Sequence, residues 1–399
     1  MHLFKSKGSV FGGTLLIMAT TVGVGMLALP IATGAGGFLP AIVIYFLCWL
    51  FMLCTGFLLL EVCLWLPKDA NLISMAHKLL GPVGKAVCWG LYLFLFITVM
   101  IAHVTGGAEI FQAILGIPSH IASACLYVLL FAPVVYLGTV SVNRLNTILF
   151  SGVILTYLLF IGFSYEHVNF SMLYRMDWPK AVLAFPIVFT AFTYQVIIPT
   201  LTTYMESNVK KIRLSILLGT TIPLVIYLVW ETLILSILPE QQLAAALELG
   251  QNAVQPLFAT TGKSLLFQVG KAFAFFTLTT SYIALALAFL DFLADGLKMH
   301  KKGWRKLFLC GLVFIPPTLI SITYPHLFLT ALSYAGGYSC AILFGLFPPL
   351  MVWVGRYHRH HISHKRQLFG EKWMLALLMC VVIGELVIQI FQDALQRIL

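Results

Sequence analysis

The sequence predicts an all-α polytopic membrane protein, and three observations carry this prediction. Of the 399 residues, 60% are hydrophobic and only 10% are charged, whereas about a quarter of a soluble domain is charged. The mean hydropathy of +0.98 excludes disordered and collagen-like chains. The apolar runs are continuous and far longer than the roughly ten alternating residues of a barrel strand. Helices remain, because only helices and closed barrels satisfy every backbone polar group in lipid.

Eleven apolar segments reach the roughly 20 residues that a membrane-spanning helix requires. In chain order, these predicted spans are residues 8–36, 38–66, 83–115, 119–137, 143–163, 178–205, 212–238, 264–293, 307–324, 327–354 and 373–391. The first is too long and too rich in glycine for a signal peptide, so we expect it to remain uncleaved. The longest loops, 164–177 and 239–262, are modest. We therefore expect one transmembrane domain over residues 1–399.

The basic residues predict the orientation of the chain. There are 24 Lys and Arg against 14 Asp and Glu, a net charge of +10. With the N-terminus in the cytoplasm and the C-terminus outside, the basic residues on the outer side are only Arg175, Lys180, Lys263, Lys271 and Arg397. The positive-inside rule favours this orientation. The excess charge therefore indicates topology, and we expect a lipid bilayer and no nucleic acid as partner.

The cysteines and one histidine-rich loop are the candidate metal ligands in this sequence. The eight cysteines are scattered through apolar runs without a CxxC or Cys/His spacing, so they are interpreted as small apolar side chains. The basic loop 356–372 contains four histidines, His358, His360, His361 and His364. A metal or pH sensor is one interpretation of this loop. A cationic loop beside anionic lipid is the interpretation that we favour.

The first span contains material that is unfavourable for a continuous helix. Residues 19–30 read ATTVGVGMLALP, with two threonines, a GxG and a proline in the middle of the span. The GxG lacks the third glycine and the βαβ context of a dinucleotide-binding fingerprint. We therefore predict a break in this helix.

The sixth span contains a similar interruption. Pro186 precedes residues 189–199, FTAFTYQVIIP, in which a glutamine, a tyrosine and two threonines lie between prolines. Spans one and six are offset by five helices, and an odd offset gives opposite orientations. The predicted organisation is therefore a five-helix repeat over 8–164, a second inverted repeat over 178–354 and an extra helix at 373–391. Matched interruptions in two inverted repeats are typical of a transporter binding site.

Broken helices supply complementary binding groups. The half-helix N-terminus offers free amides that can hold a carboxylate, and the opposite C-terminus offers carbonyls that can hold a cation. One break in each repeat thus favours a zwitterion, for which an amino acid is the natural candidate.

Several motifs resemble those of the hydroxy/aromatic amino acid permease family, within the amino acid–polyamine–organocation superfamily. They are TTVGVGMLALP at 20–30, LLLEV at 58–62, GGAE at 106–109, FTAF at 189–192, YM at 204–205, LDFLAD at 290–295 and ALSYAG at 331–336. The resemblance runs through the whole chain. It implies a LeuT-type fold of five plus five helices with an eleventh appended. It also implies secondary amino acid symport across a bacterial inner membrane.

The resemblance assigns the substrate-binding residues by position. From span one these are Thr20, Thr21, Gly23, Val24, Gly25 and Met26, and from span six Phe189, Phe192, Thr193, Tyr194 and Gln195. For Phe192 and Tyr194, packing between helices is an equal alternative. His103 and Gly107 are added from span three. His103 is expected to bond a phenolic hydroxyl or to accept a proton, with an interhelical hydrogen bond as the alternative.

The coupling cation is expected to be sodium or a proton. Relatives in the resembled family often carry a lysine in span five that replaces sodium. Span five of this chain contains no lysine, and its residues 150–154 read FSGVI. The candidate coupling-ion ligands are the hydroxyls Thr277, Thr280 and Ser281 and the carbonyls of Ala19 and Val22. They would form an oxygen-only site suited to a hard cation. Hydroxyls that bond their own helix are the alternative.

Other carboxyl groups within the spans have separate expectations. Glu61, Asp291 and Asp295 lie near cytoplasmic ends, where basic loops can pair with them. Glu109 is a candidate gate residue or structural partner, whereas Glu231 and Glu385 have no partner that the sequence identifies.

The expected function is import of an aromatic amino acid, first L-tyrosine, then tryptophan or phenylalanine. Serine or threonine is the alternative substrate class within the resembled family. A membrane-embedded enzyme is disfavoured because the sequence lacks HExxH, GxSxG and paired intramembrane aspartates. A passive channel is disfavoured because two inverted breaks favour alternating access. No cofactor is expected, and the monomer is expected to function alone.

Overall fold

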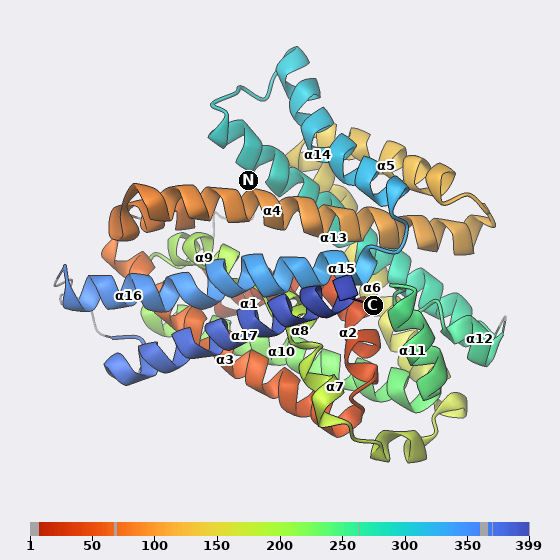
Figure 1. Cartoon of the computed structure of the whole chain (residues 1–399). Helices are drawn as coiled ribbons and strands as arrows, with labels where there is room; N and C mark the ends of the chain where they lie inside the picture. Colours follow the sequence, from red (N-terminus) through yellow and green to blue (C-terminus); the bar gives the residue numbers. More distant parts are fainter. Residues whose placement is uncertain (1–7, 68–69, 263, 360–365, 369, 399) are drawn as a thin grey trace.

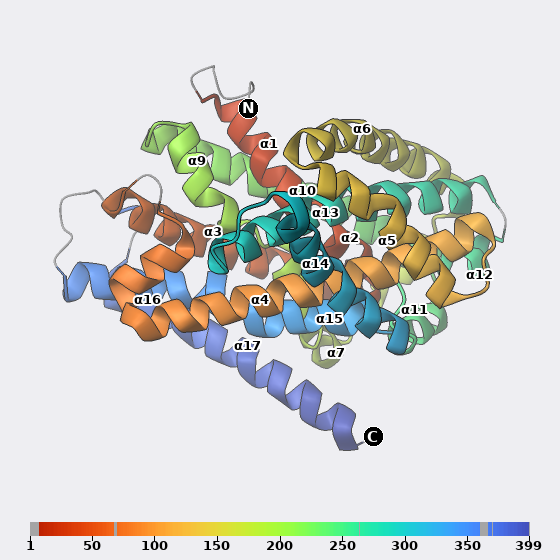
Figure 2. The same cartoon turned by 90° about the horizontal axis from the view of Figure 1, so that it is seen from above.

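The computed structural model is all-helical, with helices of very different length packed around one another (Figures 1 and 2). It describes the chain except residues 1–7, 68–69, 263, 360–365, 369 and 399, and it leaves out the side chains of 395–398. No strand occurs in the described part. Ten helices are long and apolar enough to cross a membrane, and one bent pair of helices makes an eleventh. The predicted class is confirmed, and the ten to eleven candidate spans of the described residues agree with the eleven predicted.

Eight of the eleven spans are single helices. They are α3 (Phe38–Trp65), α4 (Leu72–Leu115), α5 (His120–Leu137), α6 (Thr139–Ser164), α10 (Val209–Ile237), α13 (Leu265–Gly296), α14 (Gly303–Thr323) and α17 (Lys372–Ile398). Their length follows from long apolar runs, and side-chain caps mark several starts. Asn71 accepts the Ser74 N–H at 2.9 Å before α4, and Asn208 accepts the Lys211 N–H at 3.2 Å before α10.

The predicted break in the first span is present. This span consists of α1 (Val10–Thr21) and α2 (Val24–Gly34), which meet at an angle of 55°. Val22 has an extended backbone, although its N–H still bonds the Met18 carbonyl at 2.9 Å. Because Gly23 has no side chain to cap α2, the first amides of α2 lack a side-chain partner.

The sixth span is interrupted as well. It comprises α7 (Trp178–Val182), α8 (Phe185–Ala191), the 3-10 turn η3 (Gln195–Ile197) and α9 (Ile198–Tyr204). Thr193 and Tyr194 lie outside any helix, at the position where the sequence predicts the break.

The third predicted span begins where α4 is interrupted. α4 runs from Leu72, but the backbone of Gly81 is non-helical (φ 79°, ψ −168°), so a short first helix is separated from the long one that starts at Pro82, next to the predicted start at residue 83. A glycine with positive φ followed by a proline is a local signal for such an interruption. The segments expected to be loops also contain short helices. These are η1 (Tyr165–His167), η2 (Phe170–Tyr174), α11 (Glu240–Glu248) and α12 (Leu257–Thr261).

The tenth span differs most from the prediction of a simple helix. It passes from α15 (Phe328–Tyr334) through a π-helical segment, η4 (Ala335–Leu346), into α16 (Phe347–Tyr357). Pro348 and Pro349 open α16 and lack N–H groups, so the carbonyls of Phe344 and Gly345 at the end of η4 have no α-helical donor.

Ion pairs confirm two of the expected charge contacts. Arg356 on α16 binds Glu61 on α3 through two contacts of 2.7 Å, and both side chains are buried. Lys301 lies 2.8 Å from Asp291. All eight cysteines are unpaired. Three histidines of the 356–372 loop, His360, His361 and His364, lie outside the described residues. The residues that the structure does describe contain no cluster of three metal-ligating side chains.

Candidate functional site

The two interrupted spans meet at Tyr227 of α10. Its hydroxyl lies 2.7 Å from the Thr21 carbonyl, at the end of α1, and 3.0 Å from the Ala191 carbonyl, at the end of α8. Terminal carbonyls have no partner within their own helix. One buried tyrosine therefore holds both helix ends together. The sequence analysis missed Tyr227, because a tyrosine inside an apolar span carries no distinguishing signal.

The second half of the first span packs directly on the sixth. A Cβ atom placed on Gly25 would lie 2.8 Å from Cα and 2.9 Å from Cβ of Ala191. Only glycine permits this approach without displacing the α8 backbone. Gly25 therefore allows close contact between α2 and α8, and its predicted part in substrate binding stays a prediction.

Gly23 faces a polar group of the eighth span. A Cβ on Gly23 would lie 3.2 Å from Cβ and 3.5 Å from Oγ of Ser281 on α13. Ser281 Oγ is in turn 2.8 Å from Nε2 of His103 on α4, and His103 Nδ1 is 2.7 Å from the Val99 carbonyl. The carbonyl only accepts hydrogen bonds, so Nδ1 carries a proton. In a neutral imidazole, Nε2 therefore can only accept, and the single hydroxyl hydrogen of Ser281 is shared between Nε2 and the Thr277 carbonyl, each 2.8 Å away.

The other candidate cation ligands divide into two groups. Thr277 is buried, its hydroxyl has no partner among the described residues, and its carbonyl lies 2.8 Å from Ser281 Oγ. Ala19 and Val22 lie at the end of α1, where carbonyls are free of intrahelical bonds. Thr280, in contrast, donates to the Phe276 carbonyl of its own helix at 2.6 Å. Thr280 thus follows the alternative in which a hydroxyl satisfies its own backbone.

The hydroxyls of Thr20 and Thr21 also bond their own helix, both to the Ile17 carbonyl, at 2.7 and 2.9 Å. Val24 and Met26 are buried in α2. A Cβ on Gly107 would lie 2.6 Å from Cζ of the Tyr127 ring, so Gly107 makes room for α5 packing.

The predicted residues of the sixth span face several neighbours. Phe192 packs between the rings of Tyr45 and Tyr227, at centroid distances of 6.0 and 5.2 Å. Tyr194 donates to the Met52 carbonyl at 3.1 Å, and Gln195 Nε2 lies 3.1 Å from Thr55 Oγ1. Tyr194 and Gln195 therefore contact α3. For Tyr194, this contact is of the kind that the packing alternative predicts.

Two further members of this set also make local contacts. The Thr193 hydroxyl donates to the Phe189 carbonyl at 2.8 Å, and the Phe189 ring lies 5.2 Å from that of Phe51. Phe192 thus reaches Tyr227 at the junction, while Phe189 packs against α3.

Buried carboxyl groups hold the second half of the first span. Glu231 on α10 accepts from Thr33 Oγ1 at 2.5 Å and from Tyr45 Oη at 2.6 Å. Thr33 lies in the last turns of α2, and Tyr45 lies on α3. The structure thus supplies the partners of Glu231 that sequence reasoning could not identify.

A second buried carboxyl group, Glu109, accepts from Asn252 Nδ2 at 2.8 Å. Asn252 belongs to the segment between α11 and α12, and the neighbouring Ala253 N–H bonds the Leu27 carbonyl of α2 at 2.9 Å. The segment therefore connects α4 with α2, and Glu109 takes part in this connection.

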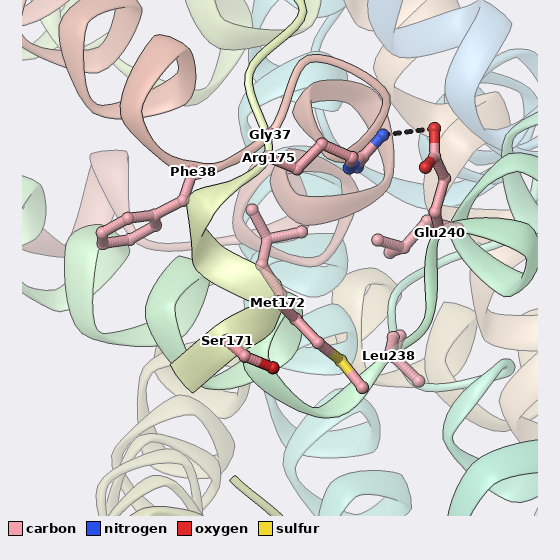
Figure 3. A pocket seen from close by; sticks show the side chains of 9 residues that line it. Gly37, Phe38, Ser171, Met172, Arg175, Leu238 and Glu240 are labelled. Atoms are coloured by element: carbon pink, nitrogen blue, oxygen red, sulfur yellow. Dashed lines mark ion pairs between the residues drawn. The ribbon is translucent and has the colours of Figure 1, made fainter. Parts of the chain in front are cut away.

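A cavity of about 180 Å³ lies beyond the C-terminal end of α2 (Figure 3). Arg175 crosses its edge, 2.5 Å from Oε1 of Glu240 on α11 and 3.2 Å from the Ala35 carbonyl. Its guanidinium also binds the Gly34 carbonyl. Arg175 therefore ties the segment before α7 to α2 and to α11.

These features define a class of protein: a multi-pass membrane protein with interrupted helices that meet inside the helix bundle, which is the construction of a transporter. Comparison with known proteins specifies the family. The chain matches the tryptophan/tyrosine permease family over residues 6–389, and it belongs to that family.

Individual relatives agree with this assignment. The chain is 28% identical to tyrosine-specific transport system 1 of Haemophilus influenzae, over 95% of each chain. It is also 28% identical to tyrosine-specific transport system 2 of that organism, over 94% of this chain and 95% of the relative. A tryptophan-specific transport protein of Pseudomonas aeruginosa is 28% identical, over 83% of this chain and 82% of its own. The protein is therefore an amino acid transporter and not an enzyme.

Proposed function

We propose that this protein is a secondary active symporter that imports an aromatic amino acid, L-tyrosine first, together with a cation. The proposed architecture is of the LeuT type, with inverted repeats over 8–164 and 178–354. The meeting of the two broken spans at Tyr227, where Gly25 packs on Ala191, is the observation that carries this proposal. Alternating access follows if the two repeats rock about such a junction.

The uncapped amides at the start of α2 support carboxylate binding near Gly23. Phe192 reaches the same junction and offers a ring for aromatic contact. Two relatives carry tyrosine in their names, which favours tyrosine, while the tryptophan-specific relatives make tryptophan and then phenylalanine the alternatives. Serine or threonine would require a smaller pocket.

The coupling cation is proposed to be sodium or a proton. The Thr277 hydroxyl, which has no partner among the described residues, and the last carbonyls of α1 support an oxygen site for sodium. Ser281 Oγ is within hydrogen-bond distance of the Thr277 carbonyl, and its lone pairs can still face the same ion. His103, hydrogen-bonded to Ser281, supports a proton acceptor at the same place. We further propose that the protein acts as a monomer in a bacterial inner membrane, with the N-terminus in the cytoplasm and the C-terminus outside.

Counterflow of labelled tyrosine in proteoliposomes tests the proposed function. Vesicles preloaded with unlabelled tyrosine should take up label transiently against its gradient, and the other aromatic amino acids should compete. Absence of counterflow with every aromatic amino acid would overturn the proposal. Uptake under imposed sodium or proton gradients then identifies the cation, and uptake that ignores sodium would exclude the sodium site.

A further inference from the structure

The eleventh helix, α17, carries a polar stripe within an otherwise apolar span. Glu385, Gln389 and Asp393 are spaced four residues apart and therefore lie on one face of the helix. Residues 372–394 of this helix reach a hydropathy of 2.5 over an 18-residue window. Figure 2 shows α17 running along the bundle and projecting beyond it toward the C-terminus. Ionisable groups in such a setting are functional candidates by default.

The stripe faces the π-helical segment η4. A Cβ on Gly345 would lie 2.8 Å from Cγ2 of Val382, and a Cβ on Gly337 would meet the side chain of Gln389. The two helices therefore run antiparallel in close contact. Glu385 lies between these two contact points, opposite the middle of η4.

Glu385 is buried without a partner. It is 1% exposed, and in the described part of the chain neither carboxyl oxygen has a hydrogen-bond donor. An unpaired carboxylate in hydrocarbon costs several kcal/mol or more, so this carboxyl group holds a proton in the present conformation.

Among the described residues, the elements packed around Glu385 bring titratable groups close to it, but no base or cation that is free to pair with it. Cys48 faces it from α3, and Cys340 and Tyr338 belong to η4. The charged residue of α16, Arg356, is occupied by Glu61. α8 contributes no titratable side chain.

A chain of hydrogen-bonded groups occupies the other end of the stripe. Asp393 accepts from Tyr338 Oη at 2.5 Å and from Gln389 Nε2 at 2.9 Å. Gln389 Oε1 accepts from Ser333 at 3.0 Å. Asp393 is partly exposed near the C-terminal end, so polar groups lead from that end of α17 toward Glu385.

The same π-helical segment contacts the interrupted sixth span on its other side. Gly336 abuts the Pro186 carbonyl, and Thr190 Oγ1 donates to the Leu332 carbonyl at 2.8 Å. Cys340 lies beside Thr193 in the break. π-Helical turns frequently occur at functional sites, and their return to α-helical pairing turns side chains about the axis. A change in η4 would therefore reach Glu385 and the break together.

We propose that Glu385 is a proton-binding site outside the five-plus-five repeats, and that its proton enters with the substrate. This inference rests on the proposed transport function. Of the two proposed coupling cations, sodium and the proton, it favours the proton. Asp393 and Gln389 form the polar entry from the outer side, and η4 connects the carboxyl group with the sixth span. Because coupling is reciprocal, substrate binding must favour protonation of Glu385 by the same factor as protonation favours substrate binding.

The test uses the full-length chain in proteoliposomes that contain a pH-sensitive dye. In the wild type, external tyrosine should drive proton influx, and an inside-alkaline pH gradient should drive tyrosine accumulation. Glu385→Gln keeps the shape of the neutral carboxyl group and removes the exchangeable proton. We expect both coupled signals to fall roughly tenfold or more in this variant, while tyrosine counterflow stays within about twofold of wild type.

Glu371→Gln is the matched control, because Glu371 directly precedes α17 and its side chain is 79% exposed; both signals should be retained. Wild-type coupling in Glu385→Gln would overturn the proposal. If tyrosine drives no proton influx in the wild type, the proton-site proposal is overturned whatever the variants do. Tyrosine counterflow in the same vesicles would still support the proposed transport function. Should Glu385→Gln not fold, Glu385→Asp must shift the pH dependence of accumulation, and an unchanged profile would refute the site.

Discussion

At the scale of single residues, the glycines of the first break have different tasks. Gly23 faces the Ser281 hydroxyl, whereas Gly25 touches the backbone at Ala191. Gly25→Leu should lower tyrosine uptake roughly tenfold or more, because overpacking at this contact must separate α2 from α8. Uptake by cells expressing equal amounts of protein measures the effect. Gly90→Leu is the control, since a Cβ at Gly90 meets nothing within 4 Å; equal activity of both variants would contradict the assigned role.

Ser281 is the residue that connects the first break with His103. Ser281→Ala removes the hydroxyl that lies 2.8 Å from His103 Nε2 and from the Thr277 carbonyl. The cation concentration for half-maximal uptake should therefore rise by roughly tenfold, the effect of one lost charge-assisted hydrogen bond. Thr318→Ala is a suitable control, because this hydroxyl only bonds the Phe314 carbonyl of α14. An unchanged cation dependence in Ser281→Ala would remove Ser281 from the proposed cation site.

At the scale of helices, α3 and α16 are joined by a buried ion pair. Glu61 accepts two bonds from Arg356 and a third from the Gln367 N–H at 2.7 Å. Glu61→Ala leaves a buried guanidinium without a counter-charge, so stability should fall by about 3–5 kcal/mol. Thermal unfolding in detergent measures this loss.

Two controls accompany the Glu61 prediction. The Arg366–Glu371 pair is exposed and 4.0 Å long, so Glu371→Ala should change stability by at most about 1 kcal/mol. The double variant Glu61→Leu with Arg356→Met should recover much of the loss, because both charges are removed together. A melting temperature of Glu61→Ala equal to wild type would contradict the structural role of the pair.

The helix breaks were predictable, and the π-helical segment was not. The first break falls at Val22 and Gly23, at the start of the predicted GxG segment, whereas Pro30 lies inside α2. In the sixth span the prolines open α8 and α9 on either side of the break. Such local signals are readable in sequence. The π-helical segment η4 approaches α8 at Gly336 and α17 at Gly337 so closely that a side chain at either glycine would clash. Such approach is a tertiary property, so residues 327–354 resembled one simple span.

At the scale of the whole molecule, the contacts that assemble the site join distant parts of the chain. Tyr227 reaches Thr21 and Ala191, and Asn252 reaches Glu109. The apolar pattern identifies which segments enter the membrane, but it does not say which helix face meets which neighbour. The sequence therefore identified Ser281 and His103 as candidates without predicting that they bond one another. The resemblance likewise grouped Tyr194 with the substrate residues and left packing between helices as an equal alternative, and the Tyr194 hydroxyl binds α3.

Arg175 provides a test of closure on the side of the molecule that the proposed orientation places outside the cell, here called the outer side. Its guanidinium joins the Gly34 and Ala35 carbonyls of α2 to Glu240 on α11, beside the cavity in Figure 3. Arg175→Gln should loosen all three elements, so a cysteine introduced at Leu238, which lines the cavity, should react several-fold faster with a membrane-impermeant maleimide. Glu240→Gln should have a smaller effect, because its side chain is 52% exposed and such pairs contribute at most about 1 kcal/mol. Lys180→Gln is the control, since Lys180 forms its ion pair with Asp177, three residues earlier in the chain. Equal labelling rates in all three variants would show that Arg175 does not hold the outer side closed.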